Sequence, residues 1–567
     1  MSMTTQNERV LLIDRLPNPD ITEKGSTIGR NVSGMNIANI GLVRSLLRYG
    51  TFDRYLFIQE SPNAEKLEKY QGRGRLQPVH LGNVECLAGI DDLVLFTTSH
   101  HLAKYVPVRQ LFRRPSWPIC GLAHGLSPNF LMPQHVWNRL SAVQSHDAVV
   151  CTSECQRLDM QAIDRAILES ACLAVRPKSD DRPSYPVIPL GIELDTVPVH
   201  RDISPKRNDS KFIVLTIARF SVESKVDLRP FIAGFLRSSD LPNDSVFIIA
   251  GDDPDGAVTR ELLSFAAQFD AKRQIRILPS AAANRRELLA VADAALCLSD
   301  NVGESFGLFL LEAMFSGLPV VAPAWNGFRE LVEHGKTGFL APTTFMDDTE
   351  LLSAFSMLID PAYTLGQRVV IDVPMAMGYL AQLAHNPQLR QDLGSEARKR
   401  ALNKYTWERI VPRYEAVWEE QIERGRCYRH TQTMGNCNFY DYGQIFGHKA
   451  TSHIRPDTVI VPSKSEGDWL QNKASIFASH RTAGFDWRIY DLIMEIIERH
   501  SSMTVQRIVE EMALHNYQKQ QVLTQIAQLL KYDLLYIKTE ERSLLETTKM
   551  SRAEFALSKN CDPNLWS

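Results

Sequence analysis

The chain has 567 residues, of which 44% are apolar and 23% are charged, and it carries a formal net charge of −3. A single hydrophobic core does not serve a chain of this length, so we expect three domains, or two large domains with an addition. The near balance of charge gives no reason to expect a nucleic-acid partner or an anionic membrane surface, and no apolar run approaches the roughly 18 residues of a membrane span.

The first third of the chain alternates predicted strands with a predicted helix. Residues 35–48 place apolar side chains at helical spacing and are followed by Gly50, which is typical of a helix and its stop signal. Four apolar runs have the length and composition of buried strands: 9–14, 55–59, 92–97 and 118–122. This pattern favours an α/β domain.

Two of these strands are followed by histidines. His100 and His101 come after the third strand, and such a pair could serve catalysis but is more often ordinary surface. The fourth strand ends in Ala123-His124-Gly125. From the residues alone, His124 is either a structural histidine or a group that faces a ligand, and both interpretations stay open.

A second domain is predicted to begin near Lys211. Residues 212–218 form a β-rich run, and Arg219 and Lys225 follow it six positions apart. A guanidinium is a planar fork for phosphate oxygens and an ammonium is a mobile point charge, so the two together suit a diphosphate. The alternative is a pair of solvated surface cations.

An acidic segment follows the next predicted strand, residues 246–250. Its sequence is Gly251-Asp252-Asp253-Pro254-Asp255-Gly256, and the three carboxylates invite a metal-binding interpretation. Clustered Asp, Pro and Gly are also typical of a turn, and we favour the turn. A further strand at 275–278 and a helix at 285–291 are predicted beyond it.

The clearest unit of secondary structure follows. Residues 294–298 predict a buried strand, 308–315 a helix with Ser305 as its N-cap, and 320–322 a second strand after a stop signal at Gly317. In such a parallel β–α–β unit, ligands bind in the loop at the carboxyl end of the first strand.

Two carboxylates flank this loop, eight positions apart: Glu304 in the loop and Glu312 in the helix. The first turn of the helix offers unpaired N–H groups, and Gly307 lets an anion approach the backbone, so we expect a phosphate here. Glu312 lies among apolar residues, where a charge must be paired or must hydrogen-bond a ligand. It therefore either pairs with an Arg or Lys elsewhere or accepts hydrogen bonds from the two hydroxyls of a ribose, while Glu304 meets a sugar.

The stretch Glu304-Ser305-Phe306-Gly307-Leu308 through Glu312-Ala313-Met314, followed by Gly317-Leu318-Pro319-Val320-Val321-Ala322, resembles the E-x7-E signature of retaining glycosyltransferases of the GT-B fold, specifically the GT4-type family called glycosyl transferases group 1. The segments Asn326-Gly327-Phe328-Arg329-Glu330 and Gly335-Lys336-Thr337-Gly338-Phe339 resemble the next two segments of that family, in order and at similar spacing.

The resemblance implies two Rossmann-like α/β lobes that face a cleft. It also implies transfer of a sugar from a nucleotide diphosphate sugar, UDP- or GDP-linked, to an acceptor hydroxyl with retention at the anomeric carbon. The acceptor would belong to a glycan or glycoconjugate. No cofactor, metal or covalent nucleophile is implied.

Residue roles carry over with the resemblance. His124 and Glu304 correspond to the catalytic residues, the imidazole meeting the transferred sugar and the carboxylate holding hydroxyls of the donor sugar. In Ser33-Gly34 a serine replaces the first glycine of the family's Gly-Gly pair, and Ala218 and Val226 replace the glycines beside the two cations. Donor binding is implied for Arg219, Lys225, Phe306, Gly307, Leu308, Glu312 and Gly34.

By the same resemblance the chain divides into four parts. These are an N-terminal lobe (1–200), a nucleotide-sugar-binding lobe (205–405), a helix that crosses back to the first lobe (406–424) and an accessory module (425–567). Residues 185–194 resemble the strand that closes the first lobe. Residues 343–370 look like an extra piece, either a lid or an interface.

Beyond residue 425 the resemblance stops. Three amphipathic helices at 487–499, 505–514 and 521–530 and a strand at 534–538 resemble a winged-helix fold. Between residues 486 and 540, six Lys and Arg oppose eight Asp and Glu, and the predicted recognition helix has only Lys519 and Lys531, at its two ends. DNA readers need a basic face, so we favour docking to a protein partner or homo-oligomerisation.

The cysteines predict the compartment. Nine are scattered along the chain and often lie in apolar stretches, which favours buried free thiols in a reducing compartment. The N-terminal residues lack the pattern of a signal peptide, so we expect a cytoplasmic protein. Two other functions stay open: a nucleotide-sugar epimerase on the same fold, and a non-catalytic nucleotide-sugar-binding or regulatory protein.

Overall fold

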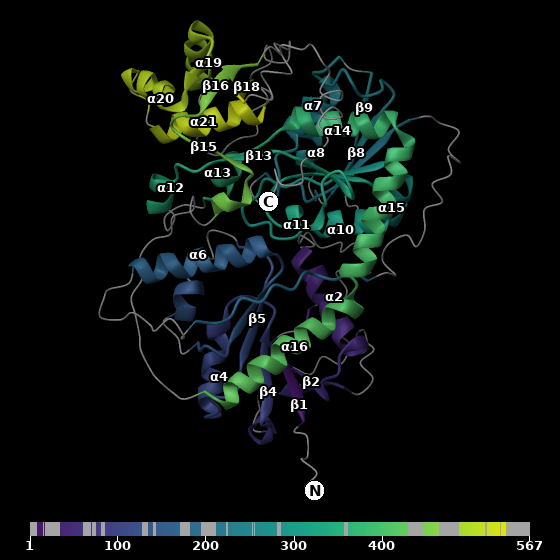
Figure 1. Ribbon diagram of the computed structural model, residues 1–567, viewed down its shortest axis with the longest axis vertical. Coiled ribbons are helices and arrows are strands. Elements are labelled where there is room, and N and C mark those ends of the chain that lie inside the picture. Colours follow the sequence, from purple (N-terminus) through teal and green to yellow (C-terminus); the bar gives the residue numbers. More distant parts are fainter. Residues whose placement is uncertain are drawn as a thin grey trace. The chain divides into compact units, whose positions relative to one another are not determined.

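The structure is a computed structural model of the chain (Figure 1). Its internal contacts divide the chain into two units: the first unit is Met1–Thr196 with Leu402–Tyr440, and the second unit is Val197–Ala401 with Asp441–Ser567. The structure describes residues 8–14, 16–17, 34–59, 70, 75–80, 86–126, 134–139, 143–170, 182–193, 211–222, 225–251, 253, 256–270, 272–279, 285–355, 361–428, 446–463, 487–515, 517, 519–532 and 534–539.

The first unit is built on a parallel sheet with the strand order β3-β2-β1-β4-β5-β6. The order reverses between β1 and β4, which is the switch point at which open α/β sheets bind ligands. Its strands are β1 (Arg9–Ile13), β2 (Arg54–Gln59), β3 (Leu76–His80), β4 (Asp92–Thr97), β5 (Ile119–Ala123) and β6 (Ala148–Cys151). Its helices include α2 (Gly34–Tyr49), η2 (Leu102–Tyr105), α4 (Val106–Leu111), α6 (Glu154–Ser170) and α16 (Trp407–Arg426).

Helix α16 belongs to the core of the first unit although it comes late in the chain (Figure 1). Its Trp418 is fully buried and packs edge-on against Phe52 and Phe96, with ring centroids 5.5 and 5.3 Å away. Its Glu415 accepts hydrogen bonds from the backbone N–H of Thr51 at 2.6 Å and from the hydroxyl of the same residue at 2.9 Å. The helix predicted to return to the N-terminal lobe is therefore packed into it.

The second unit repeats the topology of the first. Its parallel sheet has the order β12-β11-β10-β7-β8-β9, so the switch point lies between β7 and β10. The strands are β7 (Ile213–Ile217), β8 (Val246–Gly251), β9 (Gln274–Pro279), β10 (Ala294–Leu296), β11 (Val320–Pro323) and β12 (Gly338–Ala341). The helices that accompany this sheet include α7 (Arg229–Arg237), α8 (Ala257–Ala266), α9 (Arg285–Val291), α10 (Leu308–Phe315), α11 (Phe328–Leu331), α14 (Val373–His385) and α15 (Pro387–Lys404).

The extra segment predicted at 343–370 forms an interface within the second unit. Its strand β13 (Thr343–Met346) pairs antiparallel with β14 (Val369–Ile371) and parallel with β15 (Ser452–Ile454). Helices α12 (Glu350–Ala354) and α13 (Ala362–Gln367) lie between β13 and β14 in the chain. Backbone pairing thus joins the family-like lobe to the chain beyond residue 446.

Residues 487–539 and the preceding strand β16 form a compact group, here named the C-terminal module (Figure 1). Its antiparallel sheet has the order β17-β16-β18, and helix α21 also packs against α13 and β14. The predicted helices and strand are confirmed, and the winged-helix likeness stays a prediction. The elements are β16 (Val459–Pro462), α19 (Trp487–His500), β17 (Met503–Thr504), α20 (Val505–Leu514), α21 (Lys519–Lys531) and β18 (Leu535–Ile537), preceded by the short helix η6 (Gly447–Lys449).

The strand predicted at 185–194 is wrong. Isolated single-residue pairings take its place, with Val187 opposite Cys151 and Ile192 opposite Thr406, and Ser184 just before the segment lies opposite Ala148. Prolines at 186 and 189 remove two backbone N–H donors, so a regular ladder beside β6 cannot continue. The fold class itself is confirmed: two Rossmann-like α/β lobes followed by a mostly helical C-terminal region.

The cysteines of the described ranges are all free thiols. Burial was predicted correctly for Cys120, Cys151, Cys155 and Cys297 but is wrong for Cys86 and Cys427, which are exposed.

Among the helices that the structure describes, none is long and apolar enough to cross a membrane.

Candidate functional site

Lys225 and Glu304 meet at the switch point of the second sheet. Lys225 follows β7 and Glu304 follows β10, and because these strands are parallel neighbours their carboxyl ends lie at the same edge. The Lys225 ammonium and the Glu304 carboxylate form a direct ion pair, with 23% and 16% of their side chains exposed. Two residues predicted from separate motifs are thereby brought together.

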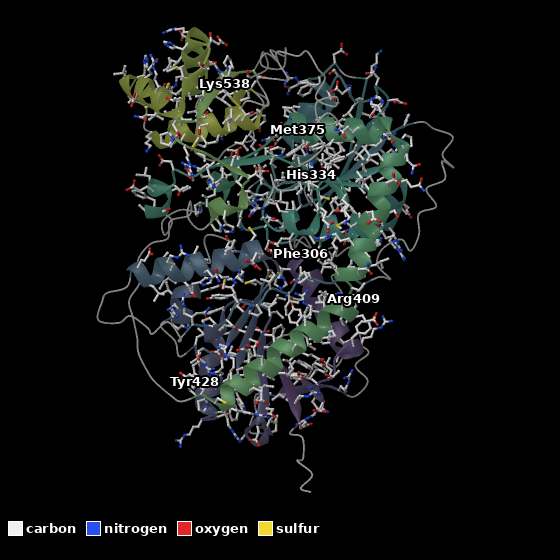
Figure 2. All side chains as sticks on the ribbon, viewed as in Figure 1. Phe306, His334, Met375, Arg409, Tyr428 and Lys538 are labelled. Atoms are coloured by element: carbon white, nitrogen blue, oxygen red, sulfur yellow. The ribbon has the colours of Figure 1, made fainter. Side chains whose placement is uncertain are left out.

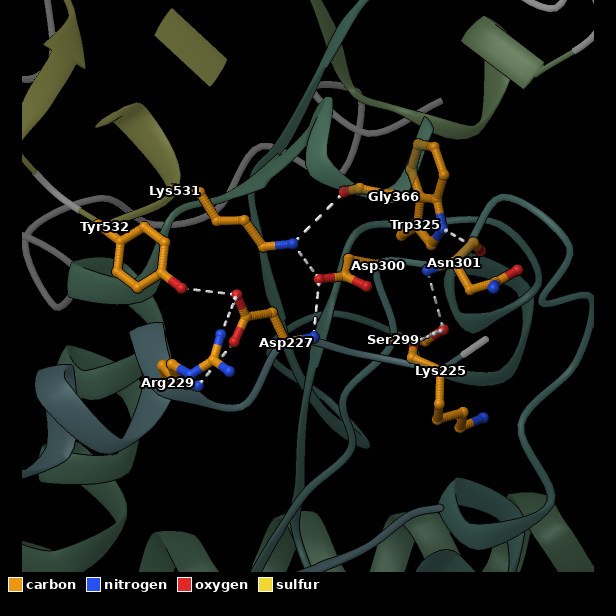
Figure 3. A network of polar contacts seen from close by, with 10 residues as sticks. All are labelled: Lys225, Asp227, Arg229, Ser299, Asp300, Asn301, Trp325, Gly366, Lys531 and Tyr532. Carbon is orange, nitrogen blue, oxygen red and sulfur yellow. Dashed lines mark hydrogen bonds and ion pairs between the residues drawn. The ribbon is translucent and has the colours of Figure 1, made fainter. Parts of the chain in front are cut away.

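Hydrogen bonds also join the loops behind this pair (Figure 3). The Ser299 hydroxyl donates to the carbonyl oxygen of Lys225 at 3.3 Å, and the backbone N–H of Asp227 donates to Oδ2 of Asp300 at 3.1 Å. The indole N–H of Trp325 donates to the carbonyl oxygen of Asn301 at 3.1 Å. The loop after β7 and the loop after β10 therefore hold each other in place.

Glu304 is ionised in a partly desolvated place. Burial opposes its charge, but the ammonium of Lys225 and hydrogen bonds from the backbone N–H groups of Phe306 and Ser305 outweigh burial and lower the pKa of Glu304 below its ordinary value. The carboxylate thus lies on the same ammonium and backbone N–H groups that were predicted to receive a phosphate. In the ligand-free protein, Glu304 is the anion of this site.

Helix α10 has the predicted bounds, Leu308–Phe315, but a different N-cap. Its N-cap is Gly307, in the left-handed region at φ 97°, and its first residue is Leu308. A β-carbon at this glycine would lie 2.3 Å from Cε1 of Phe328, so the close backbone approach and the backbone angle both require glycine. The prediction of Ser305 as N-cap is wrong, because the chain turns at the glycine two residues further on. Phe306, labelled in Figure 2, is buried beside this turn.

Glu312 lies on the second turn of α10, with 7% of the residue exposed. Oε2 of its carboxylate lies 2.8 Å from Nε of Arg285. Arg285 is therefore the Arg or Lys partner that the sequence left unidentified. Burial raises the pKa of Glu312, and Arg285 only partly opposes this. Within the described part of the chain, neither Oε2 nor the Arg285 Nε has a hydrogen-bond partner of suitable geometry, so the buried contact between them is an ion pair without a well-formed hydrogen bond.

Arg219 lies at the same edge but does not join the cluster. It follows β7 directly, and its carbonyl oxygen accepts the backbone N–H of Ser221 at 3.0 Å. In the described ranges, no ion pair or side-chain hydrogen bond links its half-buried guanidinium to the carboxylate of Glu304 or Glu312.

The first unit places the other two predicted residues. Gly34 is the first residue of α2, and His124 follows β5. The ring nitrogen Nε2 of His124 lies 2.6 Å from Oδ1 of Asn39, a residue of α2. Burial, with a smaller contribution from His100, lowers the pKa of His124 to about 3, so its imidazole is neutral at physiological pH. In a neutral ring, Nε2 can donate to the amide oxygen of Asn39 when it carries the proton.

The interpretation of the other histidines as ordinary surface is wrong for His100. Only 8% of this residue is exposed, and its ring stacks on that of His135 at a centroid distance of 5.0 Å.

Asp14 follows β1, accepts a hydrogen bond from the hydroxyl of Thr97 at 2.9 Å and forms an ion pair with Lys104. Asp14 lies at the switch point of the first sheet. The sequence analysis missed it, although its position directly after a predicted strand could have indicated it.

Sequence reasoning missed several charged neighbours of the second-unit site. Arg285 opens a helix that was predicted correctly, but nothing in its local sequence points to Glu312. Asp227 lies two residues after Lys225, and its role depends on contacts with residues far away in the chain. No group of three or more His, Cys, Asp or Glu side chains that could hold a metal ion occurs in the described ranges.

Comparison with known proteins points to one family. Residues 200–360 match the family model described as Glycosyl transferases group 1. The N-acetyl-alpha-D-glucosaminyl L-malate synthase of Bacillus anthracis is 26% identical over 179 residues, which cover 32% of this chain and 38% of that protein. The D-inositol 3-phosphate glycosyltransferase of Geodermatophilus obscurus is 32% identical over 166 residues, covering 27% of this chain and 36% of that protein.

A solved structure is similar over a longer range. The crystal structure of Anabaena Alr3699/HepE in complex with UDP aligns with a TM-score of 0.48 at 17% identity, covering 72% of this chain and 99% of that chain. The chain spans 34% to 38% of the length of the first curated relatives that it matches.

The match to the family model covers β7 to β13 and therefore includes the whole Lys225–Glu304–Glu312 cluster. Residues 200–360 are thus similar in sequence to the glycosyl transferases group 1 family.

Proposed function

We propose that the protein is a retaining glycosyltransferase that moves a sugar from a nucleotide diphosphate sugar to an acceptor hydroxyl without a resident metal. The observation that carries the proposal is the meeting of Lys225, Glu304 and the start of α10 at the switch point of the second sheet. The names of the matched relatives support a sugar transfer, since they include an N-acetylglucosaminyl and an inositol phosphate glycosyltransferase.

The chemistry that this edge offers suits a diphosphate leaving group. When the bond to the anomeric carbon breaks, negative charge grows on the diphosphate oxygens, and groups already in place to receive it lower the barrier. Lys225 supplies an ammonium, and the N–H groups at the start of α10 supply donors at the positive end of the helix dipole. Arg219, at the same edge, would add its guanidinium once the phosphates are bound.

The incompletely satisfied carboxylate of Glu312 supports a ribose at this place. Its Oε2 lies 2.8 Å from Nε of Arg285 but makes no hydrogen bond of suitable geometry in the described ranges, which is uncommon for a buried carboxylate oxygen. The vicinal hydroxyls of a ribose would donate to it and would offset the cost of its burial. Arg285 would remain as the counter-charge, so the two alternatives left open for Glu312 are compatible.

The remaining roles concern the transferred sugar. Glu304 would move from Lys225 to the hydroxyls of the donor sugar when the diphosphate takes its place on the ammonium. His124, a neutral imidazole of the first unit, would meet the transferred sugar, as the family resemblance implies. The donor is proposed as UDP-linked, since one matched relative from Streptococcus agalactiae is named a UDP-N-acetylglucosamine–peptide N-acetylglucosaminyltransferase subunit.

The first experiment is a donor screen with the purified chain. UDP-, GDP- and ADP-sugars are incubated with the protein, and free nucleoside diphosphate is measured over hours. A glycosyltransferase hydrolyses its own donor slowly even without acceptor, and the released sugar initially keeps its anomeric configuration. A binding protein would show only a melting shift with no release, and an epimerase would change the sugar while it stays attached to the nucleotide; either result would refute the proposal.

A further inference from the structure

The C-terminal module makes a buried ion pair with the donor-site loop. Lys531, the last residue of α21, places its ammonium against Oδ2 of Asp300 and donates to the carbonyl oxygen of Gly366 at 3.3 Å (Figure 3). Only 2% of the Lys531 side chain and 1% of the Asp300 side chain are exposed. Asp300 lies four residues before Glu304, in the same loop.

A second contact comes from the next residue of the module. The hydroxyl of Tyr532 donates to Oδ2 of Asp227 at 2.6 Å, and the backbone N–H of Asp227 donates to Oδ2 of Asp300 at 3.1 Å (Figure 3). The carboxylate of Asp227 also faces the guanidinium of Arg229 at 3.7 Å. Asp227 is two residues after Lys225, so the module touches both loops of the switch point.

A third contact comes from η6, which precedes the module in the chain. Lys449, 1% exposed, donates from Nζ to the carbonyl oxygen of Val302 at 2.6 Å. Its own carbonyl oxygen accepts the backbone N–H of Asn326 at 3.3 Å. The loop that carries Glu304 is therefore held at residues 300 and 302 by two buried ammonium groups.

A buried ion pair fixes the position of the side chains that it joins, but it adds little to the net stability of the fold. Removing two charges from water costs about as much as their attraction returns, so an apolar replacement is often equally stable. What a buried, hydrogen-bonded charge provides is one fixed place for the group that it touches. Two buried ammonium groups and one buried hydroxyl from beyond residue 446 reach the two loops. The loop residues that they contact, Asp227, Asp300 and Val302, lie within four positions of Lys225 or Glu304.

The recognition-helix alternative for α21 is excluded by the same contacts. Residues 522–532 are all buried, so this part of the helix presents no exposed face to a nucleic-acid groove. Its two lysines are already paired within the chain, Lys531 with Asp300 and Lys519 with Asp348. The helix is a packed component of the second unit.

We propose that the C-terminal module is part of the donor site, with Lys531, Tyr532 and Lys449 as positioning residues that fix the loops bearing Lys225 and Glu304. This inference rests on the proposed function for its consequence, since the fixed loops serve a nucleotide sugar. It assigns a role to a region that lies outside the matched family segment. Loss of these contacts removes the partners of Asp227 and Asp300 and lets both loops move.

The test compares two lysines of the same helix in the full-length chain. Lys531→Met removes the buried ammonium and keeps an unbranched side chain of similar length. Lys519→Met is the matched control, because Lys519 also pairs with an aspartate but is 58% exposed and touches neither loop. Amide hydrogen exchange is followed in peptides that cover 225–232 and 299–307, and dissociation constants are measured for UDP, GDP and ADP.

In Lys531→Met we expect exchange at least tenfold faster in both peptides, unchanged exchange across β11 and β12, and about tenfold weaker binding of the nucleotide that the wild type binds. Lys519→Met should match the wild type in all of these. Hydrogen exchange in these peptides is measured without a ligand, so it tests the positioning role independently of nucleotide binding. A wild type that binds none of the three nucleotides would refute the proposed function but not the positioning role.

Equal exchange in the two methionine variants, or equal nucleotide affinity with the loops loosened, would overturn the positioning role. Tyr532→Phe provides a second measurement if Lys531→Met does not fold. It removes one hydroxyl, keeps the buried ring and should accelerate exchange in 225–232 and weaken nucleotide binding about threefold. Wild-type behaviour of this variant would contradict the inference as well.

Discussion

Lys225 and Glu304 form an ion pair across the carboxyl edges of β7 and β10, so the ammonium proposed to receive a diphosphate already holds a carboxylate of the same chain. The charges of the two side chains neutralise each other in this pair. The pair also means that ligand binding has to compete with Glu304 for Lys225.

Glu304→Gln should therefore separate binding from turnover. Loss of the internal anion frees the ammonium, and we expect UDP, GDP or ADP to bind about three- to tenfold more tightly, since a partly buried ion pair contributes on the order of 1 kcal/mol. Turnover of the sugar donor should fall, because the carboxylate proposed to hold the sugar is gone. Isothermal titration calorimetry measures the nucleotide affinity, and the rate of donor hydrolysis measures the turnover.

The control is Glu333→Gln, which removes a carboxylate from an ion pair with Arg400 in the same unit but away from the loops of the switch point. It should change neither affinity nor turnover. Weaker nucleotide binding by Glu304→Gln would show that Glu304 does not compete with the diphosphate.

Glu312→Gln should stabilise the ligand-free protein at neutral pH. Burial raises the folded-state pKa of Glu312 above its ordinary 4.5, so the ionised side chain costs stability that increases as pH rises from the unfolded value through the folded one. The amide removes this cost. We expect a higher Tm at pH 7, no gain below about pH 4, and weaker donor binding by about tenfold because a ribose acceptor is lost.

Thermal unfolding at both pH values and nucleotide titration would measure these effects, with the exposed Glu396→Gln as control. A lower Tm at pH 7 would mean that the attraction of Arg285 exceeds the cost of burial.

Gly307→Ala should be much more damaging than Gly335→Ala. Both glycines have positive φ, 97° and 73°, and the backbone strain in a non-glycine residue costs roughly 1–2 kcal/mol at either position. Only at Gly307 would the new β-carbon overlap Phe328, at 2.3 Å, whereas nothing lies within 4 Å at Gly335. We expect an additional loss of about 1–3 kcal/mol in the free energy of unfolding for Gly307→Ala. Similar losses for the two variants in urea denaturation would contradict the close contact.

Asn39→Asp should make the His124 imidazole easier to protonate. A carboxylate 2.6 Å from Nε2 favours the protonated ring, so the pKa of His124 should rise from about 3 to roughly 4–6. NMR titration of the histidine ring protons reads this directly. Asn36→Asp is the matched control, since it adds the same charge one turn earlier on α2, and an equal rise in both variants would point to a general field effect.

The elements of the fold were predictable because their signals are local. Apolar runs such as 92–97 and 246–250 became strands with nearly the expected ends, and the helix at 505–514 has the expected bounds. Local signals failed where the backbone geometry of single residues determined the structure. Prolines interrupted the predicted strand at 185–194. The left-handed backbone angle of Gly307 made this residue, and not Ser305, the N-cap of α10.

Candidate site residues were predictable only where a motif carried them. Lys225, Glu304 and Glu312 come from such motifs and gather at one sheet edge. The partners of buried charges have no local pattern. Lys531 and Asp300 are separated by 231 positions, and a lysine at the end of a predicted recognition helix gave no sign of its aspartate. Long-range pairing of charges is a property of the folded chain.

The central claim is that Lys225 stabilises the charge of a departing nucleoside diphosphate. The most direct measurement is kcat/KM for the donor found in the screen, compared between wild type, Lys225→Ala and the exposed Lys399→Ala. The account predicts a fall of about 100- to 1000-fold for Lys225→Ala, the usual loss for one preorganised charge-stabilising group, and no change for Lys399→Ala. A Lys225→Ala enzyme that works within twofold of the wild type would contradict it.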